Sequence, residues 1–250
     1  MSTLLLRLAA PLQSWGGDSK FERRPTGRTP TKSGVIGICA AALGYRRWED
    51  QKLERLKSLG FGVRIDREGS LLRDFQMAHE EPFWDPSDRS KVNRGKSGSS
   101  HLSNRYYLAD AVFLAALEGH ETLLMEIDEA IHYPMFPLFL GRRSCPPEGR
   151  LTLGIVPDPL CSALEKHPIL AKPPKMSSSP YELRVVVDAD KYSDAKARKG
   201  GYLSHDIPIS YNRQHRIHDY RRVNEYSVSV LAVDTNHDAL ASLEEATLCT

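Results

Sequence analysis

The sequence predicts an α+β fold, and three observations carry that prediction. A leucine-rich run, Thr3–Ala10, has the length and composition of a buried strand. The segments 49–59 and 120–132 place leucine and isoleucine at helical spacing, whereas 106–117 is apolar and aromatic like a central strand. With their neighbours, these elements follow the order strand, helix, two or more strands, helix, strand. That βαββαβ order is typical of ferredoxin-like, RRM-like domains.

The first strand is followed by a predicted loop and a short helix. Pro11 and the glycines at 16 and 17 end the strand, and 15–32 is rich in proline, glycine and arginine, as exposed loops are. Ser33 offers an N-cap to a helix over 34–43, and Gly44 offers a C-cap. Despite its internal glycine, this apolar helix is expected to be buried.

The next segments predict a second helix and a hairpin. Residues 49–59 carry three leucines on one helical face, and Gly60 ends the pattern. Residues 61–66 alternate apolar and polar side chains, the segment 67–70 has turn composition, and 71–78 follows as a second strand. We therefore expect 61–66 and 71–78 to pair with each other.

The middle of the chain contains a long excursion. Residues 79–104 lack periodicity and are rich in Gly, Ser, Asn, Arg and Lys, a composition compatible with a mobile hairpin. A central strand over 106–117 and a helix over 120–132, ended by Pro134, are expected after it.

A loop over 136–147 and a strand over 151–156 complete the predicted first domain, 1–156. Residues 157–250 are expected to form a strand-containing extension packed on it. Strands are predicted at 181–188 and 225–234, with the polar, basic segment 189–224 between them, and 238–246 has helical character.

Composition excludes several classes of protein. The 250 residues carry a net charge of +2 and 40% hydrophobic side chains, unlike a disordered or collagen-like chain. The longest apolar run, 35–43, is far below the roughly 20 residues that span a bilayer. Arg7 interrupts the N-terminal apolar run, and the four widely spaced cysteines lack zinc-binding spacing. These features predict a cytoplasmic protein with reduced thiols, without a metal or cofactor.

The near-neutral total hides a local concentration of positive charge. Residues 20–32 contain five Lys/Arg and one acidic residue, and residues 87–107 also contain five and one. Residues 191–222 contain eight Lys/Arg and three acidic residues, and Arg142 and Arg143 are adjacent. We interpret these loops as a phosphate-binding surface, with Trp15, Phe21, Tyr106 and Tyr107 available to stack on bases. Solvated loop charges beside ordinary core aromatics are the alternative.

Individual motifs give little support for catalysis. Residues 26–33 imitate a phosphate-binding Walker loop, but threonines replace its glycines and Pro30 removes an N–H. Lys32 and Ser33 at a helix start remain a candidate for holding an isolated phosphate. Cys145 is expected to be structural, and His215 with His218 fits a basic loop better than a metal site.

A metal-independent ribonuclease is the other function class. It needs a base for the 2′-hydroxyl and an acid for the leaving oxygen. Two candidate sets supply such groups: one is His101, Lys96 and Tyr106, and the other is His205, Lys199 and Tyr202. Neither set is a specific motif, so RNA-contacting or solvated side chains are the simpler interpretation.

Long motifs in the first 150 residues resemble one known family. They are Leu6–Gly16, Phe21–Glu22, Arg24–Gly37, Ala40–Gly44, Leu72–Gln76, Tyr107–Phe113 and Pro137–Pro147. In content and order they resemble the CasD family, the CRISPR-associated Cascade subunit of type I-E systems.

The resemblance implies an RRM-like repeat-associated fold with a protruding thumb at about 79–105. It implies a non-catalytic subunit that holds the 5′ handle of the CRISPR RNA, caps the backbone filament and contacts the large subunit, so that target DNA is only an indirect partner. Relatives in other subtypes cut precursor RNA, which keeps an endoribonuclease as the alternative. The residues expected at the RNA are Arg23, Arg24, Arg28, Thr31 and Lys32, Lys91, Arg94, Lys96 and Arg105 around the thumb, and Arg142, Arg143 and Ser144.

Overall fold

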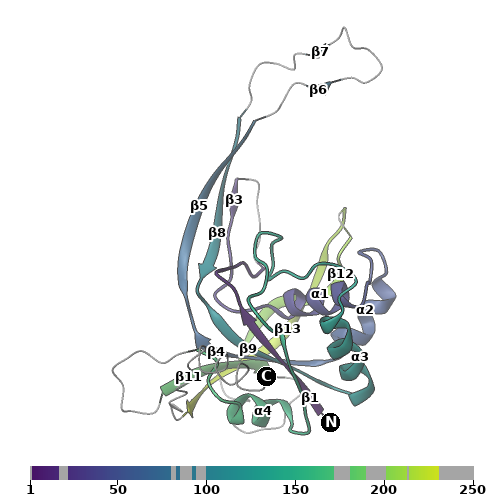
Figure 1. Ribbon diagram of the computed structural model, residues 1–250, viewed down its shortest axis with the longest axis vertical. Coiled ribbons are helices and arrows are strands. Elements are labelled where there is room, and N and C mark those ends of the chain that lie inside the picture. Colours follow the sequence, from purple (N-terminus) through teal and green to yellow (C-terminus); the bar gives the residue numbers. More distant parts are fainter. Residues whose placement is uncertain are drawn as a thin grey trace, which may run out of the picture.

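The computed structural model describes residues 2–16, 22–79, 83–84, 92–93, 100–171, 181–189, 201–212 and 214–230. It consists of a body of sheet and helices from which one long β-ribbon projects as an arm (Figure 1). The protein is thus mixed α+β, mostly sheet, with four helices among the described residues. None of these helices is both long and apolar enough to cross a membrane.

A seven-stranded antiparallel sheet forms the body. Its spatial order is β10 (Thr152–Val156), β1 (Ser2–Ala9), β9 (Val112–Gly119), β4 (Gly60–Arg67), β11 (Tyr181–Asp188), β13 (Ile217–Val230) and β12 (Tyr202–Ser210). Because β11 pairs with β4, the C-terminal strands continue the N-terminal sheet.

Helices cover both faces of this sheet. The helices α1 (Lys32–Ala42), α2 (Asp50–Lys57) and α3 (Glu121–His132) lie over one face, and α4 (Leu160–Lys166) lies over the other. Strand β1 shows the alternation, since Leu4, Leu6 and Leu8 belong to the larger core while Leu5 packs with α4.

The arm is a continuation of two core strands through a bend. Strand β4 pairs with β9 in the body, and their extensions β5 (Ser70–His79) and β8 (Ser100–Ala109) pair with each other in the arm. At the bend Gly69 has φ +70° and Asp110 has φ +56°. A Cβ at Gly69 would lie 2.4 Å from the carbonyl oxygen of Ala109, so this crossing requires glycine.

This bend corrects two predictions. The strands 61–66 and 71–78 do not pair with each other as a hairpin, because they belong to different sheets. Likewise, 106–117 is two strands divided at Asp110. The alternation of apolar and polar residues does not reveal that the chain passes from one sheet to the other at Gly69 and again, beside it, at Asp110.

Short strands complete the base of the arm. Strands β2 (Leu12–Gln13) and β3 (Arg23–Arg24) lie on one side of β8 and β5 on the other. At the far end of the arm, β6 (Phe83–Trp84) pairs with β7 (Val92–Asn93) (Figure 1). The expected excursion is therefore longer than 79–104, because its ribbon begins at Ser70.

The remaining elements match the predictions closely, with local corrections. The first helix is capped by Thr31, whose hydroxyl accepts from the Gly34 N–H at 3.2 Å, and not by Ser33. Strand β12, the first half of β13 and helix α4 were not predicted. Residues 231–234 of the predicted last strand and the predicted helix 238–246 lie outside the described residues.

Candidate nucleic-acid interface

A buried tryptophan organises the loop that leads into α1. Trp15 is 1% exposed, and its indole N–H donates to Gln13 Oε1 at 3.0 Å. Its backbone N–H donates to Thr26 Oγ1 at 2.9 Å, and its carbonyl oxygen accepts from the Gly27 N–H at 2.7 Å. The loop is therefore wrapped around Trp15, which is a core residue and cannot stack on bases.

The glycine loop between α3 and β10 is fixed to the same segment. The Ser14 N–H donates to the Leu140 carbonyl at 3.0 Å, and the Leu140 N–H donates to the Cys145 carbonyl at 2.7 Å. Gly141 has φ +90°, and a Cβ there would lie 1.5 Å from the Ser14 carbonyl oxygen. Only glycine allows this approach.

Arg142 joins the two loops to the arm. Its guanidinium lies 4.7 Å from the centroid of the Tyr107 ring and donates to the carbonyl oxygens of Tyr106 at 3.2 Å and Arg24 at 2.9 Å. Such cation–π and carbonyl contacts hold the group in one orientation. Arg142 is thus partly committed to the structure, and Tyr107, which is buried, packs in the core instead of offering a stacking face.

Tyr107 is itself tuned by this cluster. Burial favours the neutral phenol, but hydrogen bonds to Ser144 and Arg142 and the positive charge of Arg142 outweigh it and lower the pKa of Tyr107. The Tyr107 hydroxyl lies 3.5 Å from Ser144 Oγ. Ser144 and Arg143 are exposed at the end of the loop.

Further arginines gather around this cluster. Strand β3 pairs Arg23 with Asn104 and Arg24 with Arg105, and the Arg23 guanidinium lies 5.3 Å from the Tyr106 ring centroid. Arg23, Arg24 and Arg28 are exposed. Neither they nor Arg143 form an ion pair within the described part of the chain. Their charges are available to a ligand.

Arg105 differs from its neighbours. It is partly buried, and its Nε has no hydrogen-bond partner among the described residues. Buried donors are nearly always paired, so an unpaired guanidinium nitrogen beside exposed arginines is consistent with an acceptor supplied by a ligand.

Lys32 has a structural position. It is 3% exposed, and its Nζ lies 2.9 Å from Asp188 Oδ2. Its backbone N–H donates to Asp206 Oδ2 at 2.8 Å. Carboxylates therefore occupy both the ammonium group and the backbone N–H of Lys32, so Lys32 does not offer these groups to the phosphate expected at Lys32 and Ser33. Thr31 is likewise engaged as the N-cap.

Two aspartates and Arg221 complete this buried cluster. Arg221 donates to Asp206 Oδ1 at 2.6 Å and to Asp188 Oδ1 at 2.6 Å. Burial alone would raise the pKa of Asp206, but the hydrogen bonds and charge of Arg221 dominate and lower it. The charges of Lys32, Arg221, Asp188 and Asp206 balance, which is what burial of ions requires. Sequence spacing gave no signal for this cluster, because its members come from distant segments.

The described residues of the two candidate ribonuclease sets are not brought together. In the unbroken β8 ladder His101 pairs with Ala78 and Tyr106 with Arg73, so these residues, five positions apart, point to opposite faces. His205 and Tyr202 also lie on opposite faces of β12. Lys96 and Lys199, as well as Phe21, Lys91 and Arg94, lie outside the described residues.

Two further candidates from the sequence, a nucleophile at Cys145 and a metal site at His215 and His218, find no support among the described residues. Cys145 is buried, and burial raises the pKa of its thiol, as expected of a structural cysteine. In the described part of the chain no group of three or more His, Cys, Asp or Glu side chains has metal-binding geometry.

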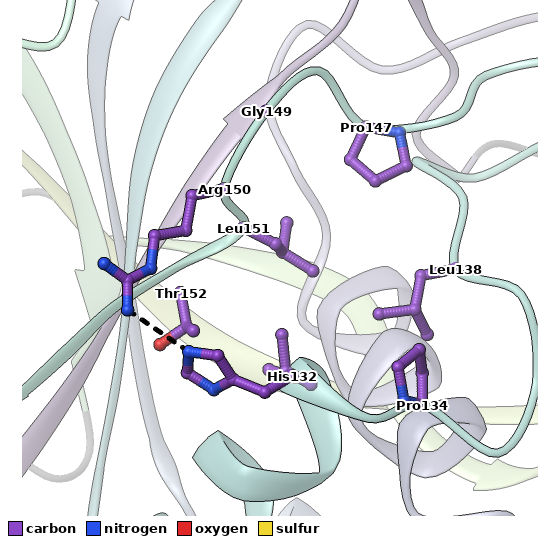
Figure 2. Close-up of a pocket in the computed structure, with 9 residues that line it drawn as sticks. His132, Pro134, Leu138, Pro147, Gly149, Arg150, Leu151 and Thr152 are labelled. Carbon is purple, nitrogen blue, oxygen red and sulfur yellow. Dashed lines mark hydrogen bonds between the residues drawn. The ribbon is translucent and has the colours of Figure 1, made fainter. Parts of the chain in front are cut away.

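A shallow pocket lies at the end of α3. Figure 2 shows Pro134, Leu138, Pro147 and Leu151 around it, with a hydrogen bond of 3.3 Å between Arg150 Nη2 and His132 Nε2 on one side. Its lining is mostly apolar, with His132, Arg150 and Thr152 as polar members, and its volume is about 320 Å³, at the lower end for ligand sites. It offers no paired acid and base.

Comparison with known proteins gives consistent matches. The sequence matches the family described as CRISPR-associated protein (Cas_Cas5) over residues 3–224. It is 36% identical over 175 residues to the CRISPR system Cascade subunit CasD of Escherichia coli (strain K12), covering 67% of this chain and 78% of that protein.

Solved structures agree with these matches. A chain of a CRISPR RNA-guided surveillance complex superposes with a TM-score of 0.75 at 30% identity, covering 97% of this chain and 98% of that one. A crystal structure of a Cas protein superposes with a TM-score of 0.65 at 35% identity, covering 91% and 95%.

Proposed function

Since the chain belongs to the CRISPR-associated Cas5 family, we propose that it is the RNA-binding structural subunit of a type I-E Cascade complex in antiviral defence. It holds the 5′ handle of the CRISPR RNA and caps the backbone filament, in contact with the backbone and large subunits. The same proposal places it in the cytoplasm.

One observation carries the proposal: Arg142 joins three separate segments into a rigid base for unpaired arginines. Its bonds to the carbonyls of Arg24 and Tyr106 fix β3 against β8. Within the described part of the chain, Arg23, Arg24 and Arg143 then present charges without ion pairs, and the Nε of Arg105 has no hydrogen-bond partner. Fixed guanidinium groups suit phosphate oxygens, and RNA binding would release counterions.

The arm supports assembly with other subunits. On one face of its ladder Phe75, Met77 and Leu102 are 57%, 54% and 46% exposed. The other face carries Asp74, Gln76, Ser103 and Arg105. A two-stranded ribbon is marginal alone in water, so an apolar face on it suits a protein partner. We assign the apolar face to a neighbouring subunit and the polar face to RNA.

The strand arrangement supports an RRM-like assignment of residues 1–156. The elements β1, α1, β4, β9, α3 and β10 follow the βαββαβ order, and their four strands are neighbours in the sheet. We regard 157–250 as an extension of this domain, because β11, β13 and β12 prolong the same sheet.

A scaffold role is favoured over an endoribonuclease. The separation of His101 from Tyr106 and of His205 from Tyr202 removes the proximity that general acid–base catalysis needs.

Binding and cleavage can be tested in one assay. The purified chain is incubated in EDTA with labelled CRISPR RNA, either complete or lacking its 5′ handle. We expect tighter binding of the complete RNA, which is recovered intact. Equal affinity for both RNAs, or cleavage at one phosphodiester, would refute the proposal.

A further inference from the structure

The outer half of the β12–β13 hairpin presents a sheet face that the helices do not cover. We call this face the hairpin platform and define it by Leu203, His205, His218, Tyr220 and Arg222. In Figure 1 the hairpin rises from the body on the side of α1 and α2, beyond the region that α4 covers. Leu203 and Tyr220 are 66% and 60% exposed.

The strand register puts these side chains together. Leu203 pairs with Arg222 and His205 with Tyr220, and directly paired residues share a face. The intervening residues Asp206 and Arg221 point to the opposite face, into the buried cluster with Lys32. That cluster therefore anchors the hairpin and fixes which side chains point outward.

Three rings form a preorganised stack on the platform. The His205 and Tyr220 rings are stacked with centroids 4.4 Å apart at 24°, and His218 meets His205 edge-on at 6.0 Å. The His205 Nε2 lies 2.9 Å from the His218 carbonyl oxygen, which makes it the protonated donor nitrogen. These contacts order the three rings, and Tyr220 remains largely exposed.

Among the described residues of the hairpin, the platform carries positive charge without an acidic side chain on the same face. Arg222 follows Tyr220 on that face, and Arg216 is exposed at the hairpin turn. Within the described part of the chain, neither forms an ion pair. The nearest acidic residue in β13, Asp219, points to the opposite face.

The hairpin turn also touches the start of α1. The Tyr211 hydroxyl donates to the Ser33 carbonyl oxygen, one residue past the end of the basic segment 20–32. The hairpin turn therefore lies beside the start of the helix that follows Arg24 and Arg28 in the chain.

We propose that the hairpin platform is a second contact for single-stranded nucleic acid, in which a base stacks on Tyr220 while Arg222 and Arg216 bind phosphates. Exposed rings interleaved with guanidinium groups are the recognition pattern of single strands. Leu203 is its only aliphatic member, which is less apolar surface than a protein interface core presents. The proposal rests on the RNA-binding function and extends its path beyond the Arg142 region.

The test measures affinity of the full chain for labelled CRISPR RNA. Tyr220→Ala is expected to weaken binding about 5- to 150-fold, the range for losing one stacked base. Tyr220→Phe keeps the ring and is expected to bind like the parent. The matched control is Tyr202→Ala, a half-exposed tyrosine of the same hairpin on the opposite face, which is expected to leave affinity unchanged.

A second variant and a mapping step separate the outcomes. Arg222→Gln should weaken binding and reduce its salt dependence, and 4-thiouridine RNA should crosslink to the peptide containing Tyr220. If Tyr220→Ala and Arg222→Gln bind like the parent while Arg143→Ala is weakened, the platform proposal is overturned and the RNA-binding function stands. If the parent binds no RNA, both fail. Loss of subunit co-purification with unchanged RNA affinity would make the platform a protein contact, which also overturns the proposal.

Discussion

Arg221 donates to both carboxylate oxygens of Asp206, from Nε at 2.6 Å and from Nη2 at 2.9 Å, and both side chains are almost fully buried. The same carboxylate accepts the Lys32 N–H at the start of α1. One aspartate thus joins the C-terminal hairpin to the helix that follows the first basic loop. Two surfaces proposed to bind RNA depend on this pair for their relative position.

Breaking the pair is expected to destabilise the whole protein. Asp206→Asn leaves the guanidinium of Arg221 with one carboxylate, and removing one partner of a buried pair costs about 3–5 kcal/mol. Chemical denaturation at neutral pH measures this loss. Glu126→Gln breaks the exposed Arg55–Glu126 pair and should cost far less, so equal losses would contradict the role assigned to burial.

The same substitution should act differently in acid. The pKa of Asp206 is lowered in the folded protein, so its contribution is fully present above the unfolded value of about 3.9 and is lost as pH falls through the folded value. The stability difference between parent and Asp206→Asn should stay constant from neutral pH to about pH 4 and narrow below it. If the stability difference between the parent and Asp206→Asn already narrows between pH 7 and 5, the titration belongs to another group.

Gly141 offers a test of the fixed glycine loop. Gly141 and Gly154 have φ values of +90° and +95°, but only a Cβ at 141 meets backbone, 1.5 Å from the Ser14 carbonyl oxygen. Both alanine variants carry left-handed backbone strain of about 1–3 kcal/mol. Gly141→Ala should lower the melting temperature considerably more than Gly154→Ala. Equal shifts would mean that the loop moves away from Ser14 at little cost.

Arg142 and Arg143 should separate structure from binding. Arg142→Ala removes the contacts to Tyr107 and to three carbonyl groups, so both melting temperature and RNA affinity should fall. Arg142→Lys keeps the charge but not the planar fork, and should restore little of the stability. Arg143→Ala should reduce RNA affinity without changing the melting temperature. An unchanged affinity would remove Arg143 from the interface.

A substitution on the apolar face of the arm should leave the isolated chain folded but prevent its assembly into the complex. Phe75→Ser replaces an exposed apolar side chain, so folding and RNA affinity should be retained while co-purification with the other subunits is abolished. The control Met125→Ser, which removes a similarly exposed apolar side chain from α3, should co-purify normally. Normal assembly of Phe75→Ser would show that this face meets no subunit.

The sequence predicted the elements whose stabilising contacts are local. The helix over 120–132 and the strand over 151–156 follow from periodicity, and both lie within a residue of their observed bounds. The pairing of 61–66 with 71–78 was wrong because the bend at Gly69 and Asp110 depends on two strands that turn together. Strand β12 was missed because its buried residues include Asp206 and Ser210, which do not read as core.

The residues of the candidate site can likewise be separated into those that the sequence predicts and those that it misplaces. The exposed arginines could be predicted from composition, because arginine-rich segments that lack an apolar periodicity can be recognised in the sequence alone. Lys32 and Trp15 were misplaced because their partners, Asp188 and Gln13, matter only once the chain is folded.

The salt dependence of RNA binding tests the central claim most directly. If about five to eight phosphates are neutralised, log affinity plotted against log salt concentration should have a slope of roughly −3.5 to −5.5. The variant with Arg23, Arg24 and Arg143 replaced by alanine should have a slope shallower by about 0.7 for each phosphate that it no longer neutralises. A flat dependence for the parent chain, or an identical slope for the variant, would contradict an interface built on these arginines.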